Sequence, residues 1–150
     1  MKISTKGKYG LEALVDLTVH ATEGPVNLKS ISSRQNLSEN YLEQIFLMLR
    51  RNKLVVSTRG AQGGYKLARS AEEISVLDVL NALEGPLAPV FCIFAGEGEG
   101  CERYDNCASR TLWEKVRAAL DSTAASITLS ELVEKYWVDS RTEYGIEYFI

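Results

Sequence analysis

The segment 38–67 constrains the fold most, because a helical repeat of apolar residues gives way there to two extended stretches around a glycine-rich turn. Ser38 is a favourable N-cap for a helix over about 39–52. The apolar residues of that helix recur at helical spacing, at Leu42, Ile45, Phe46 and Leu49. A β-branched run at 54–58 and an extended stretch at 65–67 flank the turn RGAQGG. This order predicts an amphipathic helix followed directly by a β-hairpin.

Two further helices are expected before this segment and one directly after it. Apolar residues recur at helical spacing over 8–22, where a Gly-Pro pair ends the helix, and a short polar helix follows at about 28–35. Ser75 with Asp78 opens another helix, which runs through about residue 84. A helix, a short helix, a turn, a capped helix and a glycine-tipped hairpin follow each other as in a winged helix-turn-helix. In that fold the second helix of the pair enters the major groove of DNA.

Polar side chains gather at the N-terminal end of the expected recognition helix, at Ser38, Asn40, Tyr41 and Gln44. Contacts to base edges are usually made at this end. The amide of Gln44 can bond N6 and N7 of adenine as a pair. At the hairpin tip, the guanidinium of Arg59 suits a narrow minor groove, and Gly60 beside it lets the backbone approach DNA closely.

Glu43 lies on the same side of this helix, where a carboxylate repels phosphates. It can accept a hydrogen bond from cytosine N4, or it can disfavour binding to a wrong sequence. The alternative is an ordinary solvated glutamate. Each other feature also has an ordinary explanation, a solvated polar face for the helix and a tight turn for the glycines, so the prediction of DNA binding depends on their combination.

The charge distribution favours a polyanionic partner for the first half of the chain. The formal net charge of the whole chain is −3. Residues 1–69 nevertheless hold 11 Lys and Arg against 5 Asp and Glu, whereas residues 70–150 hold 6 against 15. We therefore expect the N-terminal half to face DNA and the acidic half to serve another purpose.

Three cysteines, Cys92, Cys101 and Cys107, fall within a segment of little periodicity at 86–106 and just after it. A free cysteine is commonly a small core residue, but a loop rich in Gly and acidic residues is a poor place for one. Thiolates are soft ligands that suit iron–sulfur clusters, copper(I) or zinc. The close cysteine pair that usually begins a structural zinc site is absent, so the sequence predicts a metal-binding loop, with an iron–sulfur centre favoured.

The remainder of the chain is expected to be helical, with a long helix over about 108–126. Thr128 and Glu131 form a capping-box pattern for a last helix to about Trp137, and the tail 139–150 receives no assignment. The N-terminus has no apolar signal region and no apolar run is long enough to span a bilayer, so we expect a cytoplasmic protein without a membrane partner. With a single histidine, His20, and no phosphate-cradling motif, no catalytic arrangement is expected and the chain is not expected to be an enzyme.

Four segments resemble those of the Rrf2 family of bacterial winged-helix transcription regulators. They are MKISTKGKYG at the N-terminus, SENYLEQ at 38–44, RGAQGGY at 59–65 and ITLSEL at 127–132. The resemblance covers nearly the whole chain. It is strongest to the iron–sulfur cluster regulators of the IscR type.

The resemblance implies a mainly α fold with a small β-hairpin wing, in which a winged helix-turn-helix is followed by a long dimerisation helix. The divisions would be a DNA-binding domain at 1–84, a cluster-binding loop at 85–107, the dimerisation and C-terminal helices at 108–138, and a tail at 139–150. A homodimer would bind a palindromic operator in double-stranded DNA. The implied DNA contacts are Ser38, Tyr41, Glu43, Gln44, Arg59 and Gly60, and the implied ligands of a 2Fe–2S cluster are Cys92, Cys101 and Cys107.

The chain departs from the pattern at the expected fourth ligand. IscR-type regulators complete the cluster with a histidine three residues after the last cysteine, where this chain has Arg110, and arginine offers no lone pair to a metal. A related branch uses an aspartate near the N-terminus, whose place here is Lys8. Glu12, His20 or solvent remain as ways to complete the site.

The resemblance also offers a second function. Regulators of the CymR type control cysteine metabolism through cysteine synthase, whose active site accepts a protein tail with a C-terminal isoleucine. This chain ends in Ile150. Cysteine synthase is therefore an alternative partner, and an ordinary packed or disordered end is the other explanation of the tail.

Overall fold

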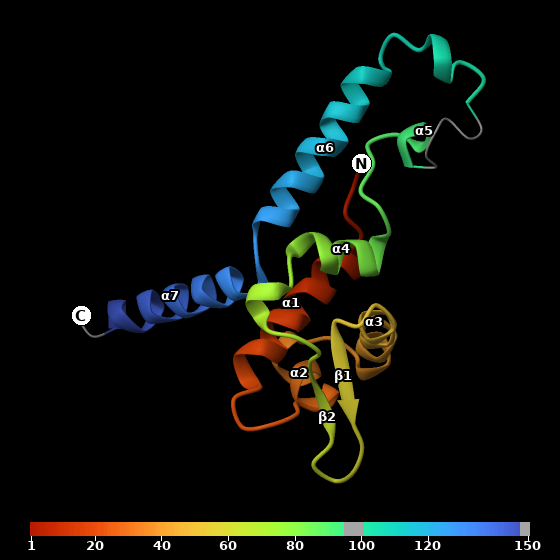
Figure 1. Cartoon of the computed structure of the whole chain (residues 1–150). Helices are drawn as coiled ribbons and strands as arrows, with labels where there is room; N and C mark the ends of the chain where they lie inside the picture. The colour runs from red at the N-terminus through yellow and green to blue at the C-terminus, as the bar shows by residue number, and fades with distance from the viewer. Residues whose placement is uncertain (95–100, 148–150) are drawn as a thin grey trace.

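A computed structural model describes residues 1–94 and 101–147 of the chain. The described residues form helices and one two-stranded sheet, in the order α1 (Thr5–His20), α2 (Leu28–Gln35), α3 (Glu39–Arg51), β1 (Val55–Thr58), β2 (Gly64–Leu67), η1 (Ala71–Glu73), α4 (Val76–Glu84), α5 (Phe91–Phe94), η2 (Tyr104–Asn106), α6 (Arg110–Ser126) and α7 (Leu129–Glu147). Helices α1 to α4 and the hairpin form one body, and α6 and α7 project from it in different directions (Figure 1).

Short polar side chains fix where the helices of this body begin. The side chain of Ser4 accepts a hydrogen bond from the first turn of α1, and Asn27 does the same for α2. Ser38 caps α3, as the sequence predicts. Ser75 and Asp78 form a reciprocal capping box at the start of α4. Each cap satisfies backbone N–H groups that have no partner within the helix and contributes about 1 kcal/mol.

The core lies where α3 packs between α1, α4 and the hairpin. Its largest fully buried side chains come from helices α1 to α4, the start of α7, β1 and the segments beside them: Leu14, Leu17, Ile31, Leu42, Ile45, Phe46, Leu49, Leu54, Val55, Ile74, Val79 and Leu129. The apolar stripe predicted for α3 is buried in full. The ring of Phe46 packs on that of Tyr65, with centroids 4.9 Å apart, and so joins α3 to β2.

The hairpin is antiparallel and has a third segment paired to it. Val55 pairs with Leu67 and Thr58 with Gly64. On its other side, Tyr65 exchanges two backbone hydrogen bonds of 2.8 Å with Val26. A Cβ atom on Gly64 would lie 2.4 Å from the Val26 carbonyl oxygen, so glycine is needed for this close approach. The structure thus confirms the predicted wing.

Two glycines bring α1 unusually close to α4. The carboxylate of Glu84 accepts hydrogen bonds from the backbone N–H of Gly7 at 2.9 Å and of Ser4 at 3.2 Å, and also from the Ser4 hydroxyl. A Cβ on Gly7 would lie 2.3 Å from this carboxylate, and one on Gly10 would lie 2.3 Å from Leu83 Cδ1. The glycines of the N-terminal motif therefore allow α1 to approach α4 closely.

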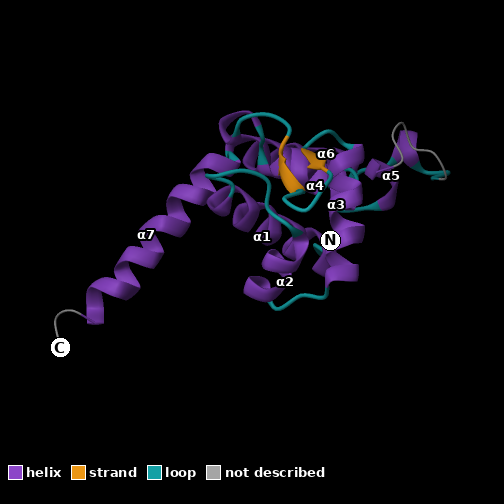
Figure 2. Ribbon diagram, turned by 90° about the horizontal axis from the view of Figure 1, so that it is seen from below, coloured by secondary structure: helices purple, strands orange, loops and turns teal. Residues whose placement is uncertain are grey.

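The C-terminal half differs from the sequence prediction in two respects. The segment expected to be a loop contains the short turns α5 and η2. Helix α7 continues to Glu147 instead of ending near Trp137, and Trp137, Val138 and Asp139 are exposed on it. Figure 2 shows α7 extending away from the body. Residues 139–147, DSRTEYGIE, contain no apolar stripe at helical spacing, so periodicity could not predict this part of the helix. No helix in the described ranges combines the length and apolar character needed to cross a bilayer.

Candidate nucleic-acid interface and cysteine arm

Helix α3 presents a polar face to solvent opposite its buried stripe. Glu43 and Gln44 are exposed on this face, and Ser38 is exposed at its start. The Ser38 hydroxyl accepts the Tyr41 backbone N–H at 3.2 Å, so it serves as the cap in the free protein. The Gln44 side chain takes part in none of the described hydrogen bonds, so its amide is available to a base edge.

Tyr41 lies differently from the other predicted contacts. Its side chain packs against the core, and its hydroxyl oxygen is buried without a hydrogen-bond partner in the described part of the chain. An unsatisfied buried hydroxyl costs about 1–3 kcal/mol. In this conformation the Tyr41 side chain stabilises the start of α3 by packing against the core. A base contact from its hydroxyl would require the side chain to turn toward solvent.

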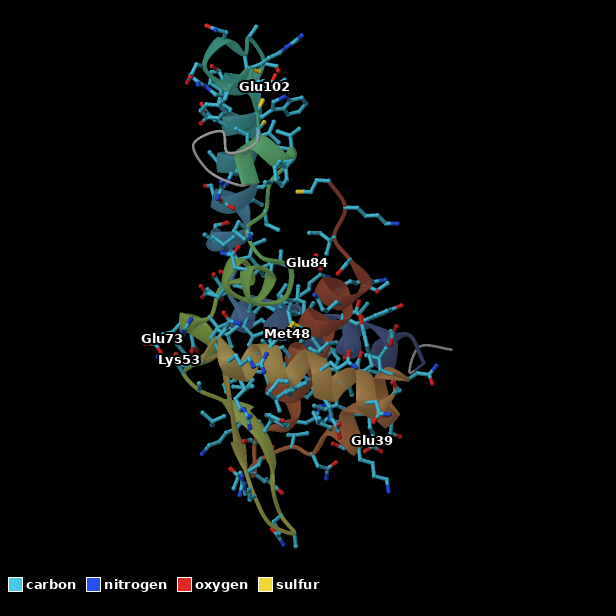
Figure 3. All side chains as sticks on the ribbon, turned by 90° about the vertical axis from the view of Figure 1, so that its right-hand side faces the viewer. Glu39, Met48, Lys53, Glu73, Glu84 and Glu102 are labelled. Carbon is cyan, nitrogen blue, oxygen red and sulfur yellow. The ribbon has the colours of Figure 1, made fainter. Side chains whose placement is uncertain are left out.

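The hairpin carries Arg59 and Gly60 at its tip, and both are exposed. Gly60 has a φ of 112°, a conformation that favours glycine. Figure 3 shows the hairpin reaching well beyond α3, with the tip far from the rest of the body. The predicted hairpin is therefore present, and its exposed tip extends beyond α3.

Further basic side chains surround the junction of α3 and the hairpin. Four of them are exposed and are not among the DNA contacts predicted from the sequence: Arg50, Arg51, Lys53 and Lys66. Arg50 donates to the Ser57 hydroxyl at 3.3 Å and so links the end of α3 to β1. These charges suit phosphate contacts, which position a protein on DNA without reading its sequence.

A buried charged contact holds α2 against α1, and sequence reasoning missed it. Arg34 donates to the Asp16 carboxylate through Nε at 3.0 and 3.1 Å and through Nη2 at 2.6 Å, and Gln35 Nε2 adds a bond of 3.0 Å. The contact with Asp16 raises the pKa of Arg34. The signal in the sequence is an acidic residue within the apolar stripe of α1, between Ala13 and Leu17. We call this contact the Asp16–Arg34 brace; it joins α2 to α1.

The three cysteines lie on the segment that runs beside the far end of α6. Its described parts, 91–93 and 101–107, are called the cysteine arm below. Cys92, Cys101 and Cys107 are free thiols and all are half-buried. No three His, Cys, Asp or Glu side chains among the described residues are grouped closely enough to hold a metal ion. The metal site expected on these cysteines is therefore not assembled in this conformation, and residues 95–100 of the same segment fall outside the described residues.

Cys107 is the thiol whose surroundings most favour the thiolate. Hydrogen bonding from Ser109, through its hydroxyl and its backbone, lowers the pKa of Cys107, and the charge of Arg110 adds to this effect. The Cys107 Sγ and Ser109 Oγ atoms are 3.4 Å apart. A lowered thiol pKa suits metal ligation, since the thiolate is the ligand form.

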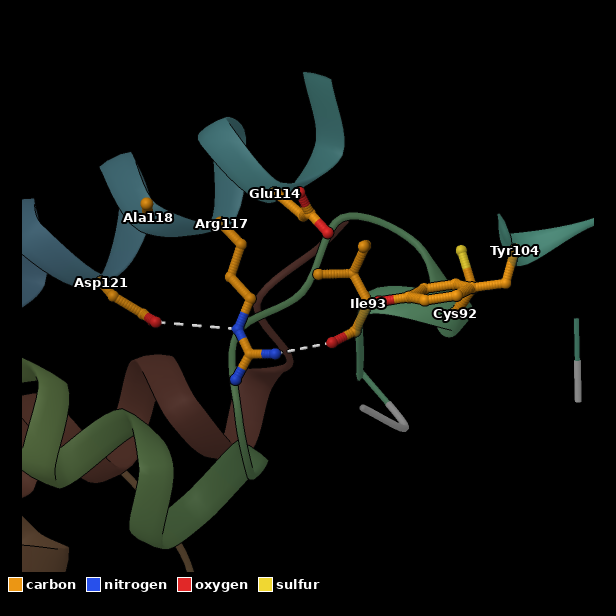
Figure 4. A pocket seen from close by; sticks show the side chains of 7 residues that line it. All are labelled: Cys92, Ile93, Tyr104, Glu114, Arg117, Ala118 and Asp121. Carbon is orange, nitrogen blue, oxygen red and sulfur yellow. Dashed lines mark hydrogen bonds and ion pairs between the residues drawn. The ribbon is translucent and has the colours of Figure 1, made fainter. Parts of the chain in front are cut away.

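A cavity of about 360 Å³ lies between the cysteine arm and α6. Figure 4 shows Cys92, Ile93 and Tyr104 on the side of the arm, and Glu114 and Arg117 on the side of the helix. Arg117 crosses this cavity to the Ile93 carbonyl. The arm and the helix are thus joined around a space that one of the three thiols lines.

Two of the residues considered as a fourth ligand lie elsewhere in this chain. Glu12 lines a groove between α1 and α7. His20 is at the end of α1, where its Nδ1 is 2.8 Å from the Asp16 carbonyl oxygen. Arg110 bonds to the backbone of Tyr104 and cannot ligate. Two carboxylates of α6, Glu114 and Asp121, line the same cavity as Cys92.

Comparisons with known proteins agree with this geometry. The chain is 42% identical over 134 residues to the HTH-type transcriptional regulator IscR of Pectobacterium carotovorum subsp. carotovorum (strain PC1), which covers 89% of this chain and 79% of the relative. It is 41% identical over 133 residues to protein rrf2 of Nitratidesulfovibrio vulgaris (strain Hildenborough), covering 89% of this chain and 87% of that one.

Solved structures share the fold as well as the sequence. CymR (YrzC), the global cysteine regulator of B. subtilis, superposes with a TM-score of 0.74 at 42% identity, covering 90% of this chain and 98% of CymR. IscR of T. potens superposes with a TM-score of 0.71 at 43% identity, covering 91% and 88%. IscR and CymR are regulators and not enzymes, in agreement with the sequence analysis. The family model for Rrf2, described as iron-dependent transcriptional regulators, matches residues 3–135. This chain, with its winged helix-turn-helix and projecting α6, therefore belongs to the Rrf2 family of transcriptional regulators.

Proposed function

We propose that this protein binds a palindromic operator as a homodimer and that a 2Fe–2S cluster on Cys92, Cys101 and Cys107 changes its affinity for that DNA. The observation that carries the proposal is that the candidate DNA contacts and the three cysteines lie in different parts of the chain. The exposed polar face of α3 and the wing tip lie on the body, whereas the three free thiols lie on an arm beside α6.

The DNA-binding part of the proposal assigns reading and positioning to different residues. Gln44 reads a base pair in the major groove, with Ser38 and Glu43 beside it. Arg59 and Gly60 of the wing contact the adjacent minor groove or backbone. Tyr41 contributes by supporting α3, or contacts DNA after its side chain turns outward. The basic residues around the end of α3 supply salt-dependent phosphate contacts.

Dimerisation is assigned to α6, the helix that joins the cysteine arm to the body. Only Ala124 of this helix is buried among its described residues, and Leu112 is 53% exposed. Val116 and Ala119 follow Leu112 at helical spacing, so α6 carries an apolar stripe that the described residues leave largely uncovered. A second copy of α6 would cover this stripe, and the twofold symmetry would present two recognition helices to a palindrome.

The donor set suits a 2Fe–2S cluster by its chemistry. The thiols are free and accessible, and the pKa of Cys107 is lowered by its hydrogen bonds to Ser109. Thiolates are the ligands that such clusters require, and the cluster would supply a centre that redox conditions or iron supply can alter. Since the three sulfurs are not grouped here, binding would draw the two described parts of the cysteine arm together beside α6.

Protein isolated without oxygen from iron-replete cells tests the proposal. We expect a visible absorption spectrum of an iron–sulfur protein, with iron and sulfide in equal amounts, and its loss when serine replaces Cys92, Cys101 or Cys107. Operator binding measured by fluorescence anisotropy should differ between cluster-loaded and cluster-free protein. Colourless, iron-free protein would contradict the cluster, and an absence of salt-sensitive DNA binding in either form would contradict the regulator.

A second function is favoured by the similarity to the CymR structure, which is that of a regulator of cysteine metabolism. In this alternative, cysteine synthase binds the C-terminal tail that ends in Ile150, which lies outside the described residues. Binding of purified cysteine synthase, compared between the full chain and a chain that lacks Ile150, separates the two functions. No affinity, or equal affinity for both chains, would contradict the alternative.

A further inference from the structure

Two arginines on one face of α6 reach the cysteine arm. Arg110 and Arg117 are seven residues apart, which is about two helical turns and roughly 10 Å along the axis. Each is followed four residues later by a carboxylate: Arg110 Nε lies 3.6 Å from Glu114 Oε1, and Arg117 Nε lies 3.7 Å from Asp121 Oδ2. Exposed ion pairs at this spacing contribute little to stability by themselves, so the importance of each arginine depends on what else its guanidinium contacts.

Arg117 holds the first end of the cysteine arm. Its Nη1 donates to the carbonyl oxygen of Ile93 at 2.6 Å, and Ile93 directly follows Cys92 (Figure 4). Ile93 is 6% exposed, so its apolar side chain is also buried at this end of the arm. The backbone position of Cys92 is thereby fixed relative to α6.

Arg110 holds the second end in the same way. Its Nη1 donates to the carbonyl oxygen of Tyr104 at 3.0 Å, and its guanidinium carbon lies 4.7 Å from the centre of the Tyr104 ring. Tyr104 opens the η2 turn between Cys101 and Cys107. The position that carries a histidine ligand in IscR-type regulators thus carries here a side chain that binds the backbone of the arm.

The geometry of arginine explains why this residue type is used twice. A guanidinium has five donors in a planar fork, so a single side chain can bond to a carbonyl on the arm and to a carboxylate on its own helix together. A lysine ammonium can neither fork in this way nor stack flat on a tyrosine ring. In the described part of the chain, these are the two side-chain hydrogen bonds that join the arm to α6.

We propose that Arg110 and Arg117 are positioning residues that clamp both ends of the cysteine arm onto α6, so that a ligand gathered by the arm moves or tightens this helix. The inference deepens the proposed function, since it supplies the path from the cysteines to the helix assigned to dimerisation. The clamp itself does not require the ligand to be an iron–sulfur cluster.

The clamp is tested first on the metal-free full-length protein. Arg117→Met should make Cys92 react with a thiol reagent roughly tenfold faster, and Arg110→Met should raise amide hydrogen exchange in 101–107 by a similar factor, as expected for the loss of one charge-assisted hydrogen bond. Arg117→Lys should fall between wild type and Arg117→Met. The control is Lys115→Met, which removes one positive charge from an exposed position on the opposite side of α6 and should leave both readouts unchanged.

The second measurement is the ratio of operator dissociation constants with and without the cluster, which should fall toward one in both methionine variants. If neither variant changes the thiol reactivity or the hydrogen exchange of the arm, the clamp is wrong, whatever the arm binds. If the arm loosens but wild-type protein takes up no cluster, the clamp stands and the proposed function fails. Should Arg117→Met not fold, as judged by circular dichroism, Arg110→Met and Arg117→Lys decide the question alone.

Discussion

Replacing Arg34 by methionine should lower the free energy of unfolding by about 3 kcal/mol, because it strands a carboxylate that water cannot reach. The Asp16 side chain is 4% exposed, and three of its contacts, at 2.6, 3.0 and 3.1 Å, come from Arg34. Among the described hydrogen bonds to this carboxylate, the one from Gln35 at 3.0 Å would remain, and His20 Nδ1 would still lie 3.6 Å from Asp16 Oδ1. Methionine keeps most of the aliphatic length, so the loss reports on the removed donors and not on a cavity.

Removing the charge of Asp16 should lower the free energy of unfolding by less than removing Arg34, because the two partners of the brace differ in their access to water. The Arg34 side chain is 33% exposed, so its guanidinium can turn toward solvent when Asp16→Asn removes the charge. We expect a loss of about 1–2 kcal/mol for Asp16→Asn, typical of hydrogen bonds to a charged group that keep a solvated alternative.

Urea unfolding followed by circular dichroism measures both values, at one fixed protein concentration because a dimer is expected. Lys29→Met is the matched control, since Lys29 is an exposed lysine on the same helix as Arg34 and its loss should change stability by less than about 0.5 kcal/mol. If Asp16→Asn costs as much as Arg34→Met, or more, the argument from unequal solvent access is refuted.

Three further outcomes are expected. Gly7→Ala should destabilise the fold by about 1–3 kcal/mol in the same urea assay, because the new Cβ would lie 2.3 Å from Glu84 Oε1 and displace the carboxylate that accepts the Ser4 and Gly7 N–H groups. A variant as stable as the wild type would show that Glu84 moves aside without cost. Gln44→Ala should cost about 1–3 kcal/mol of discrimination at one base pair, measured by anisotropy against single-base operator variants, and unchanged discrimination would mean that another face reads DNA. Ser109→Ala should raise the pKa of Cys107 toward that of an ordinary thiol, so that its alkylation in metal-free protein begins at higher pH; an unchanged pH profile would remove Ser109 as the cause.

Local sequence patterns were sufficient to predict most of the winged domain. The cap at Ser38 and the buried stripe of α3 lie as predicted, as does the hairpin. The exposed positions of Glu43, Gln44 and Arg59 also follow from helical phase and turn chemistry. These features depend on residues a few positions apart, so their energetics can be read along the chain.

The remaining features depend on atoms that are distant in sequence. The buried hydroxyl of Tyr41, the Asp16–Arg34 brace and the bonds of Arg110 and Arg117 to the cysteine arm are all set by which segments the fold brings together. The sequence by itself therefore determined the family, the elements of the winged domain and the residue types available for DNA and metal. Only the tertiary structure decided which polar groups are buried against a partner, because the cost of burying a charge or a hydroxyl depends on the atoms placed around it by remote parts of the chain.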